Sequence, residues 1–238
     1  MSTAQTFVDA LLAPDRALAG AADRKTFVPA ILAATFASLL LAFVLVPRID
    51  YERAFDEQLE RSPQGARQLS PHDREVALAQ AQKLGGVVTY ANALVWPALR
   101  ALSVASCLFL AFRVAGGRPA FRSLVAVASW GSLPLALKDL LSLPALLPMH
   151  GIAARDAERA LPSSLVALLP PGADGRLAGV TQAADLFSFL SLWLVALGAA
   201  HVSGVGRPRS FAVVFVLWGS YVLLTQIARP GLMGGGPG

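Results

Sequence analysis

Residues 186–206 read LFSFLSLWLVALGAAHVSGVG and residues 210–228 read SFAVVFVLWGSYVLLTQIA, and the basic turn RPR (207–209) joins the two segments. Neither segment contains a charged side chain. In water the pair would expose far more apolar surface than a polar face could offset, and neither shows the one-sided 3.6-residue stripe of a surface helix. The stretch therefore predicts a transmembrane helical hairpin.

The composition of the whole chain agrees with a membrane protein. Its 238 residues are 55% hydrophobic and only 15% charged, whereas charged residues supply about 25% of an ordinary soluble domain. The mean hydropathy is +0.57 and the net charge is +5. The arginines fall mainly beside apolar segments, where they anchor helix ends at lipid headgroups, so we expect no nucleic-acid partner. The lipid bilayer is the expected surroundings.

Cysteine and histidine give no sign of a metal site. The one cysteine, Cys107, lies among apolar neighbours, and the three histidines are far apart in the sequence. A disulfide within the chain is excluded, and a zinc site is not expected. No catalytic signature is present, so we expect a protein that is not an enzyme and has no cofactor.

Three further segments complete the expected bundle. Residues 27–46 are twenty uncharged residues, about 30 Å as a helix, which matches the hydrocarbon thickness. Residues 88–112 form a span with Arg100 at its centre. Residues 121–138 are short for a span and contain Pro134, where we expect a kink. The fold class is an all-α polytopic membrane protein, a five-helix transmembrane bundle with short interfacial helices, whose last two spans are 185–205 and 210–228.

The two ends of the chain are expected to flank the five spans, and the N-terminal segment to lie on the membrane or against the bundle. Residues 1–26 form an amphipathic N-terminal segment, in which Thr3–Ala13 suits a short helix that Pro14 ends. A frayed polar terminus is the alternative. The glycine-rich tail 229–238 is expected to be disordered, and residues 139–184 to form an extracytoplasmic loop.

The first large loop, 47–87, is expected to be extracytoplasmic and to contain a helix of its own. Ser70 suits the N-cap and Pro71 the first helical position, and Gly85 and Gly86 are expected to stop the helix before the second span.

Charge predicts the orientation. The two shortest loops, 113–122 and 206–210, carry five arginines and no acidic residue. With five spans both loops fall on the side of the N-terminus, so the excess of positive charge on cytoplasmic loops places the N-terminus in the cytoplasm. The loops of the far side hold more lysine and arginine in total, but these are long and also rich in acids, where the rule has little force.

Four segments carry a resemblance, in the order LLAPDRAL (11–18), LSPHDREVALAQAQKLGG (69–86), GGRPAFRSLVAVASWGSLPLAL (116–137) and DLFSFLSLWLVALGAAHVSGVGRPRS (185–210). The chain resembles the Yip membrane proteins, named for eukaryotic members that interact with Ypt/Rab GTPases, and looks like a bacterial member. The resemblance implies a Yip-like five-span domain over 27–228, a cytoplasmic N-terminus and a multi-pass protein of the bacterial inner membrane. It supplies no catalytic residue.

Three ionisable residues form a possible intramembrane polar cluster: Arg100, Asp139 and Asp185. In the five-span arrangement Arg100 lies about eight residues from the outer end of its helix, and both aspartates lie at outer helix ends. A substrate or proton site is one reading, because intramembrane charges often mark pathways. A structural ion pair, or an arginine that reaches lipid phosphate, is favoured, because a pathway usually recruits more than one central charge.

The fourth span carries further features. His201 near its inner end could titrate near neutral pH, although a histidine facing headgroups or water is the commoner case. Small residues permit close approach of helices, by default within the bundle; they are Ala196, Gly198, Ala199, Ala200 and Ser203.

The leading functional hypothesis is a non-enzymatic accessory or scaffold subunit of an envelope complex. Some bacterial relatives in the resembled family are linked to ABC exporters, so components of such an exporter are the expected membrane-protein partner. The alternative is a small-solute transporter or channel with Arg100 as its intramembrane site.

Overall fold

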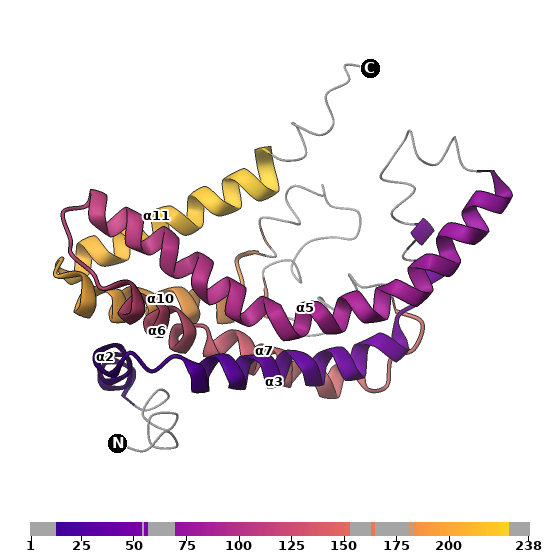
Figure 1. Ribbon diagram of the computed structural model, residues 1–238, viewed down its shortest axis with the longest axis horizontal. Coiled ribbons are helices and arrows are strands. Elements are labelled where there is room, and N and C mark those ends of the chain that lie inside the picture. The colour runs from indigo at the N-terminus through magenta and orange to yellow at the C-terminus, as the bar shows by residue number, and fades with distance from the viewer. Residues whose placement is uncertain are drawn as a thin grey trace. The chain divides into compact units, whose positions relative to one another are not determined.

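The computed structural model describes residues 13–53, 55–56, 70–152, 163–164, 181 and 183–228. In these residues the chain is helical and has no β-strand, apart from isolated bridges between Ile49 and Ile152 and between Ser164 and Asp185. The prediction of an all-α fold is confirmed. The helices are α2 (Pro14–Arg24), α3 (Val28–Leu45), η1 (Val46–Arg48), α5 (Pro71–Val114), α6 (Phe121–Gly131), α7 (Leu133–Leu146), α10 (Leu186–Ser203), α11 (Arg207–Val222) and η3 (Leu223–Ala228) (Figure 1).

Five helical stretches are long and apolar enough to cross a membrane. They are Val28–Arg48, His72–Val114, Phe121–Leu146, Leu186–Ser203 and Arg207–Thr225. Each overlaps one of the five predicted spans, so the multi-pass architecture follows from the structure as well as from the sequence. The third stretch combines α6 and α7.

The chain divides into two compact units. The described residues of the first unit are 13–34, 97–136, 163–164, 181 and 183–228. Those of the second unit are 35–53, 55–56, 70–96 and 137–152.

Helix α6 is the centre of the first unit, and every residue from Ser123 to Gly131 is buried. Small side chains make this possible, because they let α2 and α10 approach α6 from different sides. The core around α6 is apolar, with Phe112, Leu124, Val127, Ala196 and Ala199 among its members. All five residues are 0% exposed, so α6 is surrounded by protein.

Glycine at position 198 sets the distance between α10 and α6. A Cβ atom placed on Gly198 would lie 2.8 Å from Cγ1 of Val127 and 3.4 Å from Cβ of Leu18. These separations are shorter than, or at the lower limit of, ordinary contact between carbon atoms. The prediction that small residues of the fourth span permit close approach within the bundle is confirmed at this position.

The third span is broken near the predicted place. Helix α6 ends at Gly131 and α7 begins at Leu133, with Ser132 between them. Pro134 has no N–H to give to the carbonyl group four residues earlier, so the α-helix is interrupted two residues before the proline. Helix α7 then continues to Leu146. The helix therefore extends beyond residue 138, where the span was predicted to end, and the first part of the predicted loop 139–184 is helical.

The N-terminal segment contains a helix that the sequence did not predict. Pro14 begins α2, because a proline fits the first turn of a helix, where its missing N–H is not needed. The predicted helix Thr3–Ala13 lies outside the described residues except for its last residue. The predicted tail 229–238 also lies outside them.

Helix α5 begins as predicted and ends differently. The backbone N–H of Asp73 donates to Oγ of Ser70 at 3.1 Å, which confirms Ser70 as the N-cap. Gly85 and Gly86, however, do not stop the helix, which continues without interruption to Val114. A Cβ atom on Gly85 would collide with the ring of Tyr51, so this glycine makes room for the tyrosine rather than ending the helix.

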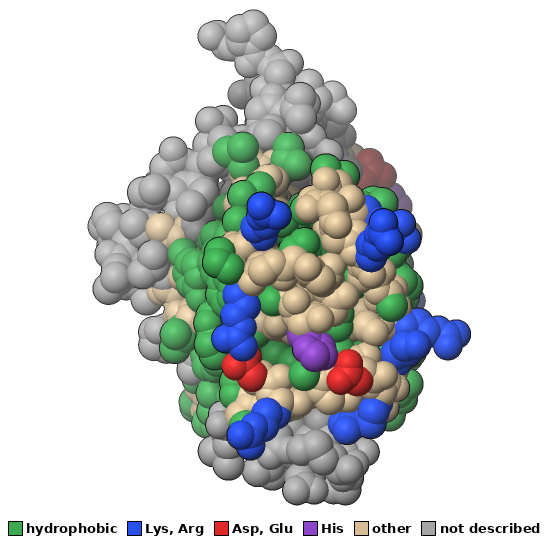
Figure 2. All heavy atoms as spheres, turned by 90° about the vertical axis from the view of Figure 1, so that its left-hand side faces the viewer, with side chains coloured by type: hydrophobic (Ala, Val, Ile, Leu, Met, Phe, Trp, Pro, Cys, Tyr) green, Lys and Arg blue, Asp and Glu red, His purple; other side chains and the backbone are tan. Residues whose placement is uncertain are grey.

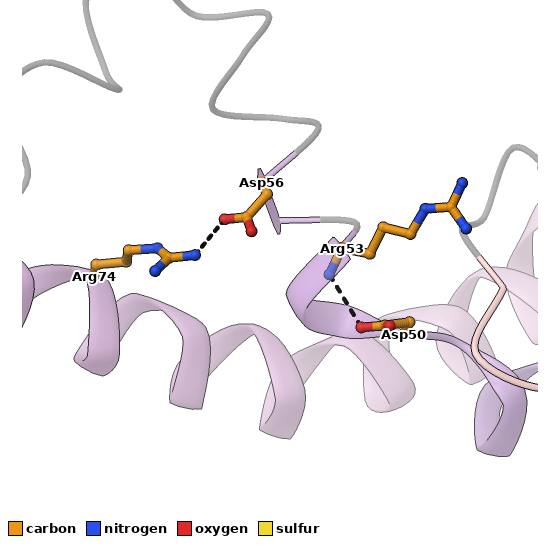
Figure 3. Close-up of polar contacts among 4 residues, drawn as sticks. All are labelled: Asp50, Arg53, Asp56 and Arg74. Carbon is orange, nitrogen blue, oxygen red and sulfur yellow. Dashed lines mark hydrogen bonds and ion pairs between the residues drawn. The ribbon is translucent and has the colours of Figure 1, made fainter.

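Several polar contacts of the second unit lie near the ends of its helices. The guanidinium of Arg48 donates through Nη1 to the carbonyl oxygen of Val44 at 2.6 Å and through Nε to that of Leu147 at 3.3 Å. The N–H of Arg53 donates to Oδ1 of Asp50 at 3.0 Å, and Nη2 of Arg74 lies 2.6 Å from Oδ1 of Asp56 (Figure 3).

Candidate functional site

The two short basic loops meet at one end of the first unit. The N–H of Arg118 donates to the carbonyl oxygen of Ser203 at 3.1 Å, and the N–H of Gly117 donates to that of Phe112 at 2.7 Å. A Cβ atom on Gly117 would lie 2.8 Å from the oxygen of Ser203. The close passage of the two backbones therefore requires glycine at this position, and the loops lie together, as the five-span arrangement predicted.

Helix α2 lies at the same end of this unit. Its apolar side is small and fully packed, with Leu18 only 2% exposed and Ala21 and Ala22 at 0%. Two hydrogen bonds from α6 attach it: Oγ of Ser123 donates to the carbonyl oxygen of Ala22 at 3.0 Å, and Nε1 of Trp130 to that of Thr26 at 2.7 Å. Helix α2, which the sequence did not predict, is thus packed into the first unit.

A left-handed residue ends α2. Lys25 has a φ of 54°. The N–H of Thr26 donates to the carbonyl oxygen of Ala21 at 3.0 Å and the N–H of Lys25 to that of Ala22 at 3.2 Å. This pair of bonds is the Schellman arrangement, which usually has glycine at the left-handed position.

Both acidic side chains of α2 are paired with basic partners on other helices. Oδ2 of Asp15 lies 3.3 Å from Nη2 of Arg207, and Oδ1 of Asp23 lies 3.1 Å from Nε2 of His201. Figure 2 shows this face, on which basic side chains surround two acidic ones and a histidine. The pairing links α2 to α10 and α11.

Five arginines form what we call the basic end: Arg113, Arg118, Arg122, Arg207 and Arg209. All five are exposed. The guanidinium carbon of Arg113 lies 5.1 Å from the centre of the Phe109 ring, a cation–π contact.

The helix termini add to the positive potential of the basic end. Helices α6 and α11 begin here, and their N-caps, Ala120 and Gly206, supply no side-chain acceptor for the first N–H groups. Such N–H groups, together with the helix dipole, attract anions. By contrast, carbonyl groups at the C-terminal ends of α5 and α10 are occupied, because Phe112 and Ser203 accept from loop N–H groups.

The predicted polar cluster is divided between the units. Arg100 is exposed on α5 in the first unit. Asp185, in the same unit, is 1% exposed and caps α10, accepting from the N–H and Oγ of Ser188 at 3.3 Å each. Asp139 belongs to the second unit, where its Oδ2 accepts from Oγ of Ser38 at 3.1 Å. The cluster of all three residues stays a prediction.

Two features of the site were missed in the sequence. The capping role of Asp185 had a signal, an aspartate directly before an uncharged apolar helix. The pairing of Asp15 and Asp23 had none, because their partners lie 192 and 178 residues away. Among the described residues, no group of three or more His, Cys, Asp and Glu side chains could hold a metal ion.

A family comparison accounts for nearly all of the chain. The family model of the Yip1 domain matches residues 8–228. The chain belongs to the Yip1 domain family. The match begins before residue 27, where the predicted membrane domain started, so α2 is part of the Yip1 domain. All the described helices, from α2 to η3, fall within it. Among curated proteins and among solved structures, no match to the chain was found.

Membership of the family and the five apolar helices agree. The protein is a multi-pass Yip1-domain membrane protein, with five helical stretches long and apolar enough to cross a lipid bilayer. The basic end is the part of this domain at which α2, the two short loops and the ends of α5, α6, α10 and α11 come together.

Proposed function

We propose that this Yip1-domain protein is a non-enzymatic accessory or scaffold subunit of a larger membrane complex, such as an ABC exporter. In this proposal it lies in a bacterial inner membrane with α2 on the cytoplasmic side. The observation that supports the role best is the use of buried polar side chains in the first unit, which join helices to one another.

Each of four buried or half-buried donors bonds to the backbone of another helix or its adjoining turn. Oγ of Ser191 on α10 donates to the carbonyl oxygen of Gly131 on α6 at 2.7 Å, and Oγ of Ser210 on α11 to that of Ala196 on α10 at 2.8 Å. Ser123 and Trp130 on α6 hold α2 in the same way. Side chains used in this manner stabilise the arrangement of the helices, as a rigid scaffold requires.

Large apolar side chains point away from the protein on two helices. On α3 they include Leu32 and Phe36, 62% and 63% exposed, and on α5 they include Trp96 and Leu110, 57% and 65% exposed. In a bilayer such faces contact lipid tails or the helices of another membrane protein. They are the surfaces through which a scaffold subunit would bind its partner.

The basic end supports the proposed orientation. Its arginines lie on two short loops that contact each other, and short basic loops mark the cytoplasmic side of a bacterial membrane protein. Labelling of single cysteines from each side of the membrane tests this: in a Cys107→Ser background, Val114→Cys, 91% exposed at the end of α5, should react only from the cytoplasm. Reaction from the other side would reverse the orientation.

The experiment that tests the scaffold role is photocrosslinking in native membranes. A photoreactive amino acid is placed singly at exposed positions of α3 (Leu32 and Phe36) and α5 (Trp96 and Leu110), and protein adducts are identified. A partner should give adducts of one protein from neighbouring positions on one helix face. Scattered adducts of abundant membrane proteins from every position would contradict a scaffold role.

Arg100 separates the scaffold from a transporter. Arg100→Gln removes the charge at an exposed position of α5 and should leave the crosslinked partner in place. Loss of solute flux in reconstituted vesicles, with the partner retained, would instead support a transport site.

A further inference from the structure

We propose that the basic end binds the phosphodiester headgroups of anionic lipids in the leaflet at which α2 lies. The inference goes beyond the proposed scaffold role and does not depend on any protein partner. It rests on the depth of the arginines in the membrane, on the pairing of the local acids and on the open helix termini.

The depth of the arginines is fixed by the helices that carry them. Arg113 directly follows the fully buried Phe112 near the end of α5, Arg122 is the second residue of α6, and Arg207 and Arg209 lie in the first turn of α11. Each of these helices belongs to a stretch that can cross a membrane. Because the apolar stretches occupy the hydrocarbon, side chains within one turn of their ends lie at the level of the headgroups.

The acidic side chains of α2, which would compete with a phosphate group for the arginines, already have basic partners. Asp15 and Asp23 are the acidic residues of α2, and they pair with Arg207 and His201. These pairs leave Arg118, Arg122 and Arg209, which are exposed, facing the headgroup region. A guanidinium group binds the two free oxygens of a phosphodiester through parallel N–H bonds.

The backbone favours the same ligand. Neither α6 nor α11 has a side-chain cap at its N-terminus, although Pro208 leaves the first turn of α11 with one N–H group fewer, and Arg122 and Arg209 lie in these first turns. A phosphate group close to either terminus would meet both the guanidinium and the open N–H groups. An acidic soluble protein would need to reach the same groups among the headgroups of the leaflet, which makes a lipid the better-matched occupant.

The test uses the full-length protein in neutral-detergent micelles doped with dioleoylphosphatidylglycerol. Binding is measured by native mass spectrometry, which counts bound lipids, and by the lipid-dependent rise in unfolding temperature. Dioleoylphosphatidylcholine at the same mole fraction is the zwitterionic arm. Soluble glycerol 3-phosphate is the arm that distinguishes a lipid headgroup from a free phosphate ester.

The decisive variant is Arg118→Gln/Arg122→Gln/Arg209→Gln. It spares Arg113 and Arg207, which have structural contacts with Phe109 and Asp15. Near an anionic surface each basic residue contributes about a fivefold change in affinity, so the triple variant should bind phosphatidylglycerol roughly 100-fold more weakly. Its unfolding temperature without lipid should equal that of the wild type.

A matched control removes the same charge elsewhere. The variant Arg53→Gln/Arg74→Gln/Lys83→Gln changes three exposed basic residues of the second unit and should bind phosphatidylglycerol as the wild type does. Asp15→Asn should have the opposite effect. It releases Arg207 from its ion pair and should raise the affinity for phosphatidylglycerol by about fivefold.

Three outcomes would overturn the proposal. The triple variant could bind phosphatidylglycerol as tightly as the control variant, the wild type could bind phosphatidylcholine equally well, or glycerol 3-phosphate could displace the lipid completely. The last result would assign the site to a soluble phosphate ester instead of a membrane lipid.

Discussion

The two units of the protein differ in where their polar side chains form bonds. In the first unit the bonds of Ser123, Ser191 and Ser210 are buried and join one helix to the backbone of another. In the second unit the bonds of Arg48 to Leu147 and of Arg74 to Asp56 are exposed, and the half-buried bond of Ser38 to Asp139 joins two side chains. The first unit therefore joins its helices by buried bonds from side chains to backbone, whereas water or headgroups can replace the exposed bonds of the second unit.

The largest expected effect is at the closest helix contact of the first unit. Gly198→Ala places a methyl group 2.8 Å from Cγ1 of Val127, and overpacking of this kind costs about 1–3 kcal/mol. Gly219→Ala is the control, because nothing lies within 4 Å of its added Cβ atom, and it should be neutral or slightly stabilising. Unfolding midpoints in detergent measure both.

A second substitution can show that the collision causes the loss. Val127→Ala removes both methyl groups that the new Cβ atom would touch, so Gly198→Ala/Val127→Ala should cost less than the sum of the single variants. Additive losses would mean that the contact between α6 and α10 is not the cause.

A smaller loss is expected for one buried hydrogen bond. Ser191→Ala removes the bond from α10 to the carbonyl oxygen of Gly131 and should cost about 0.6 kcal/mol, with an upper limit near 1.7. Ser106→Ala removes a bond within a single helix, from the exposed Ser106 to the carbonyl oxygen of Leu102, and should cost almost nothing. Equal losses would remove the distinction between bonds that join helices and bonds that do not.

The second unit should respond to alkaline pH. Burial, and then the proximity of Tyr90, raise the pKa of Tyr51 above its ordinary value. Because the unfolded chain loses this proton first, the stabilisation is complete below about pH 10 and falls as the pH rises through the folded pKa. Denaturation at increasing pH should show this loss in the wild type and a weaker loss in Tyr51→Phe; identical profiles would contradict the assignment.

The smallest effect is expected for the exposed ion pair of the second unit. The side chains of Arg74 and Asp56 are both 46% exposed, so Asp56→Asn should shift the unfolding midpoint less than any of the preceding variants apart from the controls, and 1 M salt should abolish even this difference. A larger, salt-independent loss would show that this contact is comparable with the buried bonds of the first unit.

The spans were predictable because a long, uncharged, apolar helix is seldom stable in water and is stable inside a bilayer. Helix α2 was not, because three of its four buried residues are alanines and its ends are charged, so its packed side carries only one large apolar side chain. The continuation of α5 through Gly85 could not be predicted from the sequence either, because the ring that requires this glycine belongs to Tyr51, 34 positions away.

The candidate site was predictable only in part. The arginines of the two short loops marked one end of the bundle, since their charge interrupts the apolar segments. The partners of Asp15 and Asp23 depend on how α2 packs against α10, and this packing follows from Gly198 and the alanines around it rather than from any charge pattern.

The left-handed turn at Lys25 has a consequence for work with tagged forms of the protein. The turn fixes how the chain leaves α2 for the first span, while the bonds from Ser123 and Trp130 hold both sides of the turn. A fluorophore or antibody epitope attached at Pro14 would therefore be rigidly oriented relative to the first unit and would not rotate freely. Distances measured from such a probe would report the position of the bundle itself.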